Sequence, residues 1–104
     1  MAKKEPRLSH QALKVLSILL QRPQESVAGS DILRQTGMLS GTVYPILMRF
    51  ERAKWLESEW EQLEPKDAGR PRKRLYRLSP NGYNKARAAL AELELPQGRL
   101  AWNY

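Results

Sequence analysis

The chain has 104 residues, no cysteine, one histidine and a formal net charge of +7 at neutral pH. This length favours one domain, and the lack of cysteine excludes disulfides and thiolate metal sites. No apolar run reaches the roughly 18 residues of a membrane-spanning helix, and the first residues lack the apolar core of a signal peptide. We therefore expect a cytoplasmic protein with no membrane role and an acidic partner, such as nucleic acid.

The first helix is predicted over residues 10–21. Ser9 suits its N-cap, and Pro23 ends the apolar pattern. Residues 1–8, which precede it, are expected to form a flexible basic arm.

A second, shorter helix is predicted over residues 30–36. Ser30 can cap its first turn, and Gly37 suits the position after its last turn. A tight turn then leads into a third helix. We expect this helix to begin near Thr42, because an earlier start would cost Pro45 an intrahelical hydrogen bond. Two short helices joined by a tight turn are typical of a helix-turn-helix.

The third helix has two faces of opposite character. Arg49 and Arg52 lie outside its apolar face, together with the hydroxyls of Thr42 and Tyr44, while Glu51 is the one acidic residue there. Such a face suits a polyanion, and the major groove of DNA admits a helix. An ordinary solvated surface is the alternative from this helix alone. The apolar residues recur at i, i+3, i+4 and i+7, which defines one helical face: Val43, Ile46, Leu47 and Phe50.

After the third helix the apolar period shortens to that of strands. Strands are predicted over residues 55–61 and 73–78. The segment between them, residues 62–72, is rich in proline, glycine and charge, and is expected to be a long, mobile, basic tip. Trp55 and Trp60 are expected to pack this hairpin onto the helices.

The two predicted strands carry opposite charge. Glutamates alternate along the first strand, and five cations without an acid occupy residues 70–77. Cross-strand pairs, worth about 0.2–1 kcal/mol each, account for Lys73 and Arg77. They account poorly for Arg70 and Arg72, which we expect to be available to a polyanion. The glutamates also suggest a metal site, but solvated strand charges are far more common.

A last helix is predicted to open at Ser79, with Pro80 in its first turn, and to end before Pro96. Its apolar stripe can pack on its own domain or on a second copy. We expect both, because the rest of the core is small. The stripe and one residue of the tail form the predicted dimerisation surface: Tyr83, Ala86, Leu90, Leu93 and Trp102.

These elements predict a mainly α fold with a small β-hairpin, of the α+β class. A winged helix-turn-helix DNA-binding domain is expected over residues 9–79. A C-terminal dimerisation helix and tail are expected over residues 80–104.

Four short motifs stand in this order along the chain, at residues 40–51, 55–58, 69–73 and 76–79. They read Ser-Gly-Thr-Val-Tyr-Pro-Ile-Leu followed by Phe-Glu, then Trp-Leu-Glu-Ser, Gly-Arg-Pro-Arg-Lys and Tyr-Arg-Leu-Ser. Their combination resembles the PadR family of bacterial transcriptional regulators. The resemblance covers about residues 9–95.

The resemblance implies a homodimer that binds double-stranded DNA at a palindromic operator and represses transcription. By position, it implies helix contacts from Ser40, Thr42, Tyr44 and Arg49. It likewise implies wing contacts from Arg70, Arg72 and Lys73. From aromatic content alone, a small-molecule effector, if one exists, is expected near Trp55, Tyr83 and Trp102.

Two other functions fit the same residues. One is a nonspecific or architectural nucleic-acid-binding protein, and the other is a winged-helix module whose basic wing binds an acidic protein. An enzyme is disfavoured, because the chain has no phosphate-binding glycine loop and no acid pair beside a base. We expect no cofactor and no catalytic or metal site.

Overall fold

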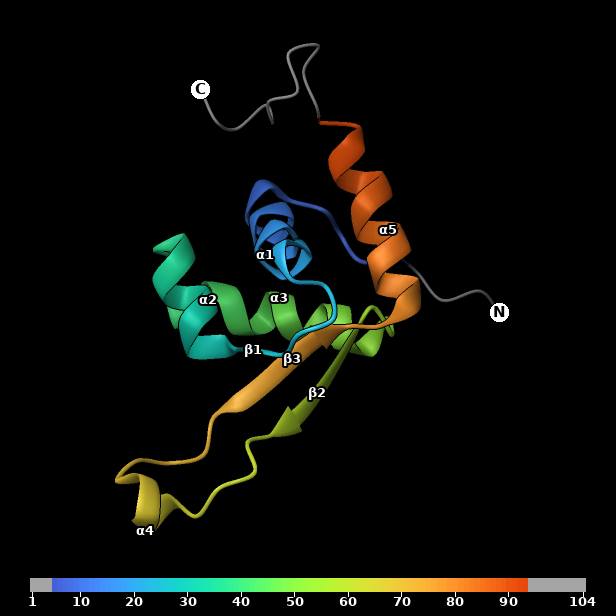
Figure 1. The fold of residues 1–104 in the computed structure, drawn as a ribbon. Coiled ribbons are helices and arrows are strands. Elements are labelled where there is room, and N and C mark those ends of the chain that lie inside the picture. The colour runs from blue at the N-terminus through green and yellow to red at the C-terminus, as the bar shows by residue number, and fades with distance from the viewer. Residues whose placement is uncertain (1–4, 94–104) are drawn as a thin grey trace.

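The computed structural model of the protein describes residues 5–93. The elements follow in the order α1 (His10–Gln21), β1 (Val27–Ala28), α2 (Gly29–Thr36), α3 (Ser40–Arg52), β2 (Leu56–Trp60), α4 (Pro65–Ala68), β3 (Arg74–Leu78) and α5 (Pro80–Ala91). Helices α1, α2, α3 and α5 form a helical body (Figure 1). The hairpin of β2 and β3, residues 56–78, extends from this body as a wing. The predicted winged helix-turn-helix is confirmed.

The first helix forms as the sequence predicts. The Oγ of Ser9 accepts a hydrogen bond from the backbone N–H of Ala12 at 3.2 Å. This bond satisfies one of the donors that a helix start leaves unpaired. The apolar face of α1 is buried along its length: Ala12, Leu13, Val15, Leu16 and Leu19.

The second helix begins earlier than predicted, because Ala28 and not Ser30 is its N-cap. The cause is the short strand β1, in which Val27 pairs with Tyr76 of β3. This pairing holds the chain extended up to the helix start. A two-residue strand has no readable period, so the sequence pattern does not reveal it. Gly37 ends α2 in the left-handed region with φ 72°, as predicted.

The third helix begins at Ser40, whereas the sequence predicted a start near Thr42. The carbonyl of Leu39 accepts the backbone N–H of Thr42 at 2.9 Å, which completes an earlier first turn. Pro45 therefore lies inside the helix and leaves the carbonyl of Gly41 without its intrahelical donor. Both Gly41 and Pro45 are exposed, so solvent can satisfy this carbonyl and the early start costs little.

A three-stranded antiparallel sheet in the order β1-β3-β2 joins the body to the wing. In the β2–β3 pair, Leu56 opposes Leu78 and Glu57 opposes Arg77. The predicted cross-strand ion pair of Arg77 forms, with its Nη2 3.2 Å from the Oε1 of Glu57. The sequence predicted only the two strands of the hairpin.

The tip of the wing contains a one-turn helix, α4, where the sequence predicted an irregular, mobile segment. Pro65 lies in its first turn, and Gly69 ends it in the left-handed region with φ 70°. The N–H of Gly69 donates to the carbonyl of Pro65 at 2.9 Å. Proline and glycine here mark the two ends of a helical turn.

Three residues fasten the start of α5 to the end of α3: Trp55, Ser79 and Gly82. The Oγ of Ser79 accepts the N–H of Gly82 at 2.9 Å and donates to the carbonyl of Lys54 at 2.7 Å. The N–H of Ser79 donates to the carbonyl of Trp55 at 2.9 Å. Trp55 is buried and stacks on Phe50 with ring centroids 5.2 Å apart, which confirms its predicted packing role.

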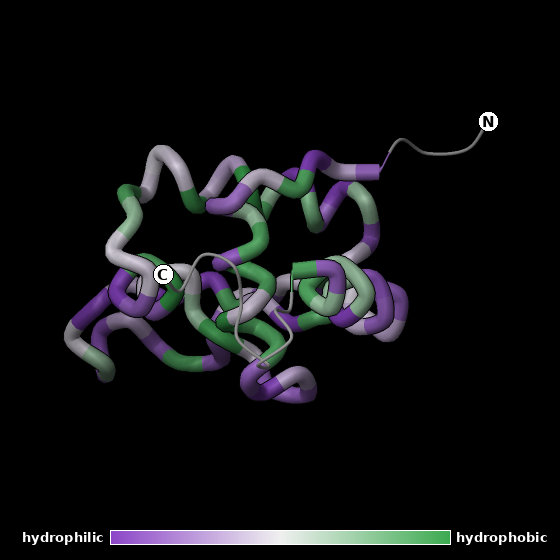
Figure 2. Tube along the Cα trace, turned by 90° about the horizontal axis from the view of Figure 1, so that it is seen from above, coloured by the Kyte–Doolittle hydropathy of each residue, from purple (hydrophilic) through white to green (hydrophobic). Residues whose placement is uncertain are grey.

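One apolar core unites the helices with the base of the wing. Along the helices, hydrophobic stretches alternate with hydrophilic ones, as expected of helices that bury one face (Figure 2). Ala86 of α5 is fully buried in this core, so α5 belongs to the same packed unit as the preceding elements. Of the predicted arm, residues 5–8 are described, and the Oε1 of Glu5 lies 2.9 Å from the Nζ of Lys85.

Lys54 has a φ of 66°, and no other residue of the described chain apart from glycine has a positive φ. A Cβ in this region costs about 1–2 kcal/mol. We therefore expect Lys54→Gly to raise the free energy of unfolding by about 1 kcal/mol, after allowance for the flexibility of glycine in the unfolded chain. Urea denaturation would measure this change. Lys54→Ala removes the same charge but keeps the Cβ, so equal stability of the two variants would contradict the argument.

Candidate nucleic-acid interface

The outward face of α3 forms the first part of the candidate interface. The helix buries the predicted apolar face, so its opposite side is directed to solvent. Of the four helix contacts expected from the resemblance, Ser40, Tyr44 and Arg49 are exposed and Thr42 is half-buried.

The centre of this outward face consists of residues that the sequence analysis did not select as contacts. Gly41, Pro45, Met48 and Arg52 follow the spacing i, i+4, i+7 and i+11, and all four are exposed. The signal that finds them is the position opposite the buried stripe, because one helical period fixes both faces.

Tyr44 packs within the domain as well as facing solvent. Its side chain is large and 36% exposed, and its ring lies against the start of α2. A Cβ added to Gly29 would stand 2.7 Å from the Cε1 of Tyr44. The ring can rest there because residue 29 has no side chain, and this contact helps to hold α2 against α3.

Two cations of α3 are uncompensated. Arg49 and Arg52 are exposed, and neither forms an ion pair with any residue from 5 to 93. The one acidic residue of the helix, Glu51, is occupied elsewhere, because it accepts the hydroxyl of Ser58 and lies 3.9 Å from Arg74. The outward side of α3 is therefore net positive.

Arg70 is already paired inside the wing, contrary to the prediction that its charge is available. Its Nη1 and Nη2 lie 2.7 and 3.1 Å from the two carboxylate oxygens of Glu61. Glu61 also accepts the backbone N–H of Lys73 at 3.1 Å. The hydrogen bond from Arg70 is the main cause that lowers the pKa of Glu61 to about 2. The pair braces the wing below its tip.

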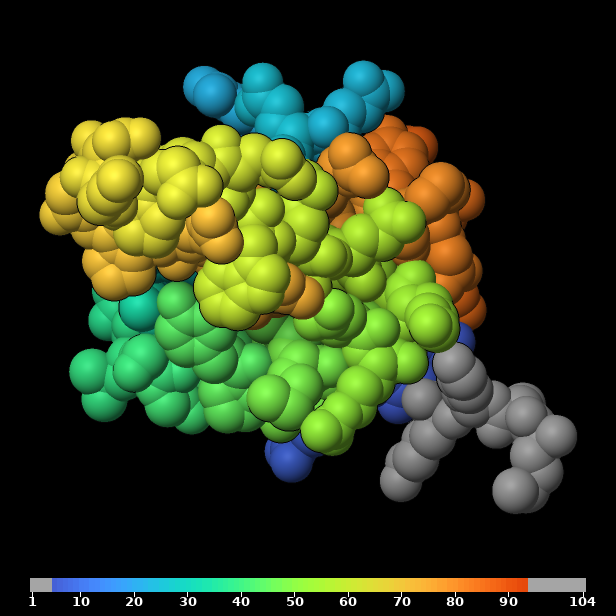
Figure 3. Space-filling view, turned by 90° about the horizontal axis from the view of Figure 1, so that it is seen from below, coloured from blue at the N-terminus to red at the C-terminus, as the bar shows by residue number. Residues whose placement is uncertain are grey.

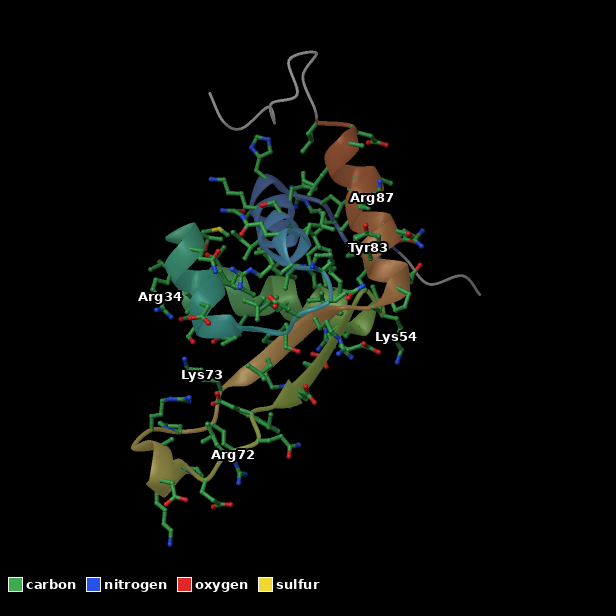
Figure 4. All side chains as sticks on the ribbon, viewed as in Figure 1. Arg34, Lys54, Arg72, Lys73, Tyr83 and Arg87 are labelled. Atoms are coloured by element: carbon green, nitrogen blue, oxygen red, sulfur yellow. The ribbon has the colours of Figure 1, made fainter. Side chains whose placement is uncertain are left out.

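The other two predicted wing contacts differ from each other. The Nε of Arg72 donates to the carbonyl of Leu63 at 2.7 Å, and its guanidinium lies 3.5 Å from Glu64. The side chain of Lys73 forms no ion pair within residues 5–93, so its predicted cross-strand pair is wrong. Both residues lie on the stem of the wing, below the helical body (Figure 4). The uncompensated wing charge among the three is therefore that of Lys73.

Trp60 is 58% exposed, so its predicted packing onto the helices is wrong. Trp60 lies on the strand face that the sequence pattern predicts. However, the end of β2 extends beyond the helical body, so the helices do not cover this face there (Figure 1). The guanidinium of Arg74 lies over its ring, 4.9 Å from the centroid. Arg74 also donates to the Oγ of Ser58 at 2.8 Å and so links Trp60 to the polar contacts around Glu51 of α3.

A groove of about 640 Å³ lies between the wing and the helical body. Four of its lining residues are basic and three are aromatic, and Figure 3 shows the wing and α3 side by side on this face. Such a surface suits the sugar-phosphate backbone of a nucleic acid. The lining residues are Ser30, Tyr44, Trp60, Arg70, Pro71, Arg72, Lys73, Arg74 and Tyr76.

The pairing of Glu61 gives a pH prediction. Its pKa is about 2 in the folded protein against an ordinary value of 4.5. The stabilisation is therefore complete above pH 4.5 and is lost as the pH falls toward 2. An NMR titration of the side-chain carboxyl carbons should give Glu61 a midpoint near pH 2, and Arg70→Gln should return this midpoint toward 4.5. A wild-type midpoint near 4.5 would show that the ion pair does not form in solution.

The predicted dimerisation residues of α5 contact the core of their own protomer. Ala86 is fully buried, so its side chain cannot reach a second copy in this arrangement. Tyr83, Leu90 and Leu93 are half-buried and pack against the same core. Trp102 lies outside the described residues.

Trp55 is 3% exposed and lies in the core, so its side chain offers little surface to an effector. The effector position expected near Trp55, Tyr83 and Trp102 stays a prediction. Tyr83 borders a pocket of about 560 Å³ that also contains the ion pair of Glu57 and Arg77. The guanidinium of Arg87 lies over the ring of Tyr83, 5.5 Å from its centroid, on the α5 side of the molecule (Figure 4).

Residues 5–93 contain neither a cluster of metal ligands nor a helix suited to span a membrane. In this part of the chain, no three side chains of His, Cys, Asp or Glu are placed to hold a metal ion. Glu57 and Glu61 of the predicted glutamate strand are engaged by Arg77 and Arg70 instead. None of the described helices is both long and apolar enough to cross a membrane.

Several solved structures share this fold. The structure of disulfide-formed AbfR has a TM-score of 0.69 and 24% identity, covering 86% of this chain and 62% of that one. This chain thus spans less than two thirds of AbfR. A PadR-like transcription factor from Bacteroides fragilis has a TM-score of 0.61 and 24% identity, covering 80% and 82%. A PadR family regulator from Clostridium difficile R20291 has a TM-score of 0.66 and 21% identity, covering 81% and 86%.

The sequence itself gives a more specific assignment than these structural likenesses. No curated protein matches it. The family described as transcriptional regulator PadR-like matches residues 15–88, which include α2, α3, the wing and most of α5. PadR-like regulators bind DNA, which agrees with the basic groove and the cations of α3. The chain therefore belongs to the PadR-like family of transcriptional regulators.

Proposed function

We propose that the protein binds double-stranded DNA sequence-specifically, as a homodimer on a palindromic operator, and represses transcription. The observation that carries the proposal is a single basic face. It combines Arg49 and Arg52, the two uncompensated cations of α3, with Lys73 and the groove beside the wing.

On this proposal α3 enters the major groove and the wing lies along the backbone. The early turns of a recognition helix contact base edges, so Ser40, Thr42 and Tyr44 are the base-contact candidates, with Arg49 beside them. Phosphate contacts supply the salt-dependent part of the affinity. We assign Lys73 to this role.

The paired wing arginines have a different expected role. Arg70 and Arg72 already donate to Glu61, Glu64 and a backbone carbonyl. They would contact phosphate only by exchanging or sharing those partners. We propose that they chiefly hold the shape of the wing in the free protein.

The dimer is proposed to form along α5. Tyr83 and Leu90 of α5 and Leu93 just after it are half-buried, and the small residue Ala91 is exposed at the end of the same helix. A second copy packed there would bury this surface, and a two-fold dimer would read two half-sites roughly 34 Å apart.

Binding measurements on a selected duplex test the proposal in two respects. Sedimentation of the complex should give two chains per duplex, and Ala91→Arg should reduce this to one chain with weaker binding. Lys73→Ala should flatten the dependence of log affinity on log salt by about 0.9, and Arg70→Ala should flatten it less.

Two results would contradict the proposal. One chain per duplex at full affinity would remove the homodimer. Equal affinity for selected and random duplexes would favour the nonspecific nucleic-acid-binding alternative. Repression itself is tested by a reporter gene placed behind the selected site, whose expression should fall when the protein is produced.

A further inference from the structure

The recognition face of α3 carries an exposed apolar side chain at its centre. Large apolar residues are exposed at five positions in the described chain, and three of these lie on α3 or its N-cap: Leu39, Tyr44 and Met48. Met48 is 51% exposed. Single exposed apolar side chains are ordinary on protein surfaces, so the position of Met48, rather than its exposure alone, requires an explanation.

Met48 occupies the middle of the outward stripe, with Pro45 one turn before it and Arg52 one turn after it. It cannot turn inward, because the opposite face is filled by fully buried side chains such as Leu47 and Phe50. Earlier in the stripe, Gly41 has no side chain, and a Cβ there would meet nothing within 4 Å. The first turn of the helix therefore has no side chain at this outward position. Met48 projects from a surface whose backbone can approach a partner closely.

The charges around Met48 indicate the class of partner. Arg49 is adjacent in sequence, Arg52 lies one turn on, and neither has an acidic partner within residues 5–93. An apolar protein surface at this position would leave both cations without anions. A DNA duplex supplies phosphates on both sides of its major groove.

The major groove presents one distinctive apolar group, the C5-methyl of thymine, among hydrogen-bond donors and acceptors. A thioether forms no bidentate hydrogen bond with a base edge. Its flexible chain adapts readily to a small apolar group.

We propose that Met48 is a specificity-determining residue that reads the methyl group of a thymine in each half-site of the operator. This proposal rests on the proposed function, because it names a base that the same face selects. Burial of one methyl group predicts about a fourfold gain in affinity. The gain is about 16-fold over two symmetric half-sites.

Deoxyuridine substitution tests the proposal, since it removes only the methyl group of thymine. Each symmetric pair of thymines in a selected operator is replaced in turn, and affinity is measured for the wild-type protein, Met48→Leu and Met48→Gln. We expect one pair whose replacement weakens wild-type binding about 16-fold. Met48→Leu should keep this penalty, whereas Met48→Gln, of similar length but polar, should remove it and leave the penalties at other thymines unchanged.

Several outcomes would overturn the proposal. The proposal fails if the wild type binds every deoxyuridine-substituted operator with unchanged affinity. It also fails if Met48→Gln shows the same loss of affinity as the wild type. Neither result contradicts the proposed function. If the wild type tolerates every replacement and Met48→Gln binds DNA with unchanged affinity, the Met48 side chain makes no contact with DNA that contributes to binding. A chain that selects no duplex at all overturns both proposals. Because Met48 is exposed, thermal unfolding of each variant should match that of the wild type.

Discussion

Gly82→Ala is expected to destabilise the protein by about 3 kcal/mol or more, the upper end of overpacking costs. A Cβ at this position would stand 1.9 Å from the carbonyl oxygen of Trp55 and 2.6 Å from its carbonyl carbon. These are backbone atoms, so no side-chain rotation can relieve the clash. The same carbonyl accepts the N–H of Ser79, so a shift would also break the contact that fastens α5 to the end of α3.

Gly41→Ala is the matched control for this substitution. Gly41 also lies in a helix, but an added Cβ would meet nothing within 4 Å. Alanine is favoured over glycine in helices by roughly 1 kcal/mol, so this variant should be at least as stable as the wild type. Urea denaturation followed by circular dichroism would measure both changes. A Gly82→Ala variant as stable as the wild type would show that α5 does not pack as closely as described.

The double variant Arg49→Ala/Arg52→Ala is expected to lose about 100-fold in affinity for a selected operator. Each arginine that contacts DNA contributes about 1–3 kcal/mol to the free energy of binding. These two arginines have no ion-pair partner within residues 5–93 that would compete with DNA for them. For each of the two that contacts a phosphate, the salt slope should fall by about 0.9. For each that reads a base, discrimination between sequences should fall instead. Fluorescence anisotropy at several salt concentrations would separate the two roles.

Lys14→Ala/Arg22→Ala controls for the change in net charge. Both residues are exposed on or just after α1, which lies on the other side of the helical body from the wing (Figure 1). This variant should keep most of its affinity. Comparable losses in the two double variants would mean that binding follows overall charge, and the assignment of α3 as the contact helix would fail.

Elements whose ends are set by local chemistry could be predicted from the sequence. Ser9 and Ser79 cap their helices through their own side chains, and Gly37 takes the left-handed conformation that glycine favours. Elements that depend on distant partners could not. Strand β1 exists because Val27 pairs with Tyr76, and no local pattern contains that pairing.

The candidate site likewise has parts that local sequence patterns predict and parts that depend on distant contacts. The period that buries Phe50 also places Met48 and Arg52 outward, so both were available from the sequence. The ion pairing of the wing arginines could not be predicted from the sequence, because Arg70 contacts Glu61 only once the wing has folded around α4. Charge counting along the chain therefore overstated the cations that the free wing presents.

On the proposed function, this face of α3 and the wing reads a DNA sequence. The most direct measurement is the selection of bound duplexes from a random pool at physiological salt. We expect enrichment of a two-fold-symmetric site with half-sites about one helical turn apart, roughly 34 Å. Binding without enrichment that fades steeply with salt, or no binding at all, would contradict the claim.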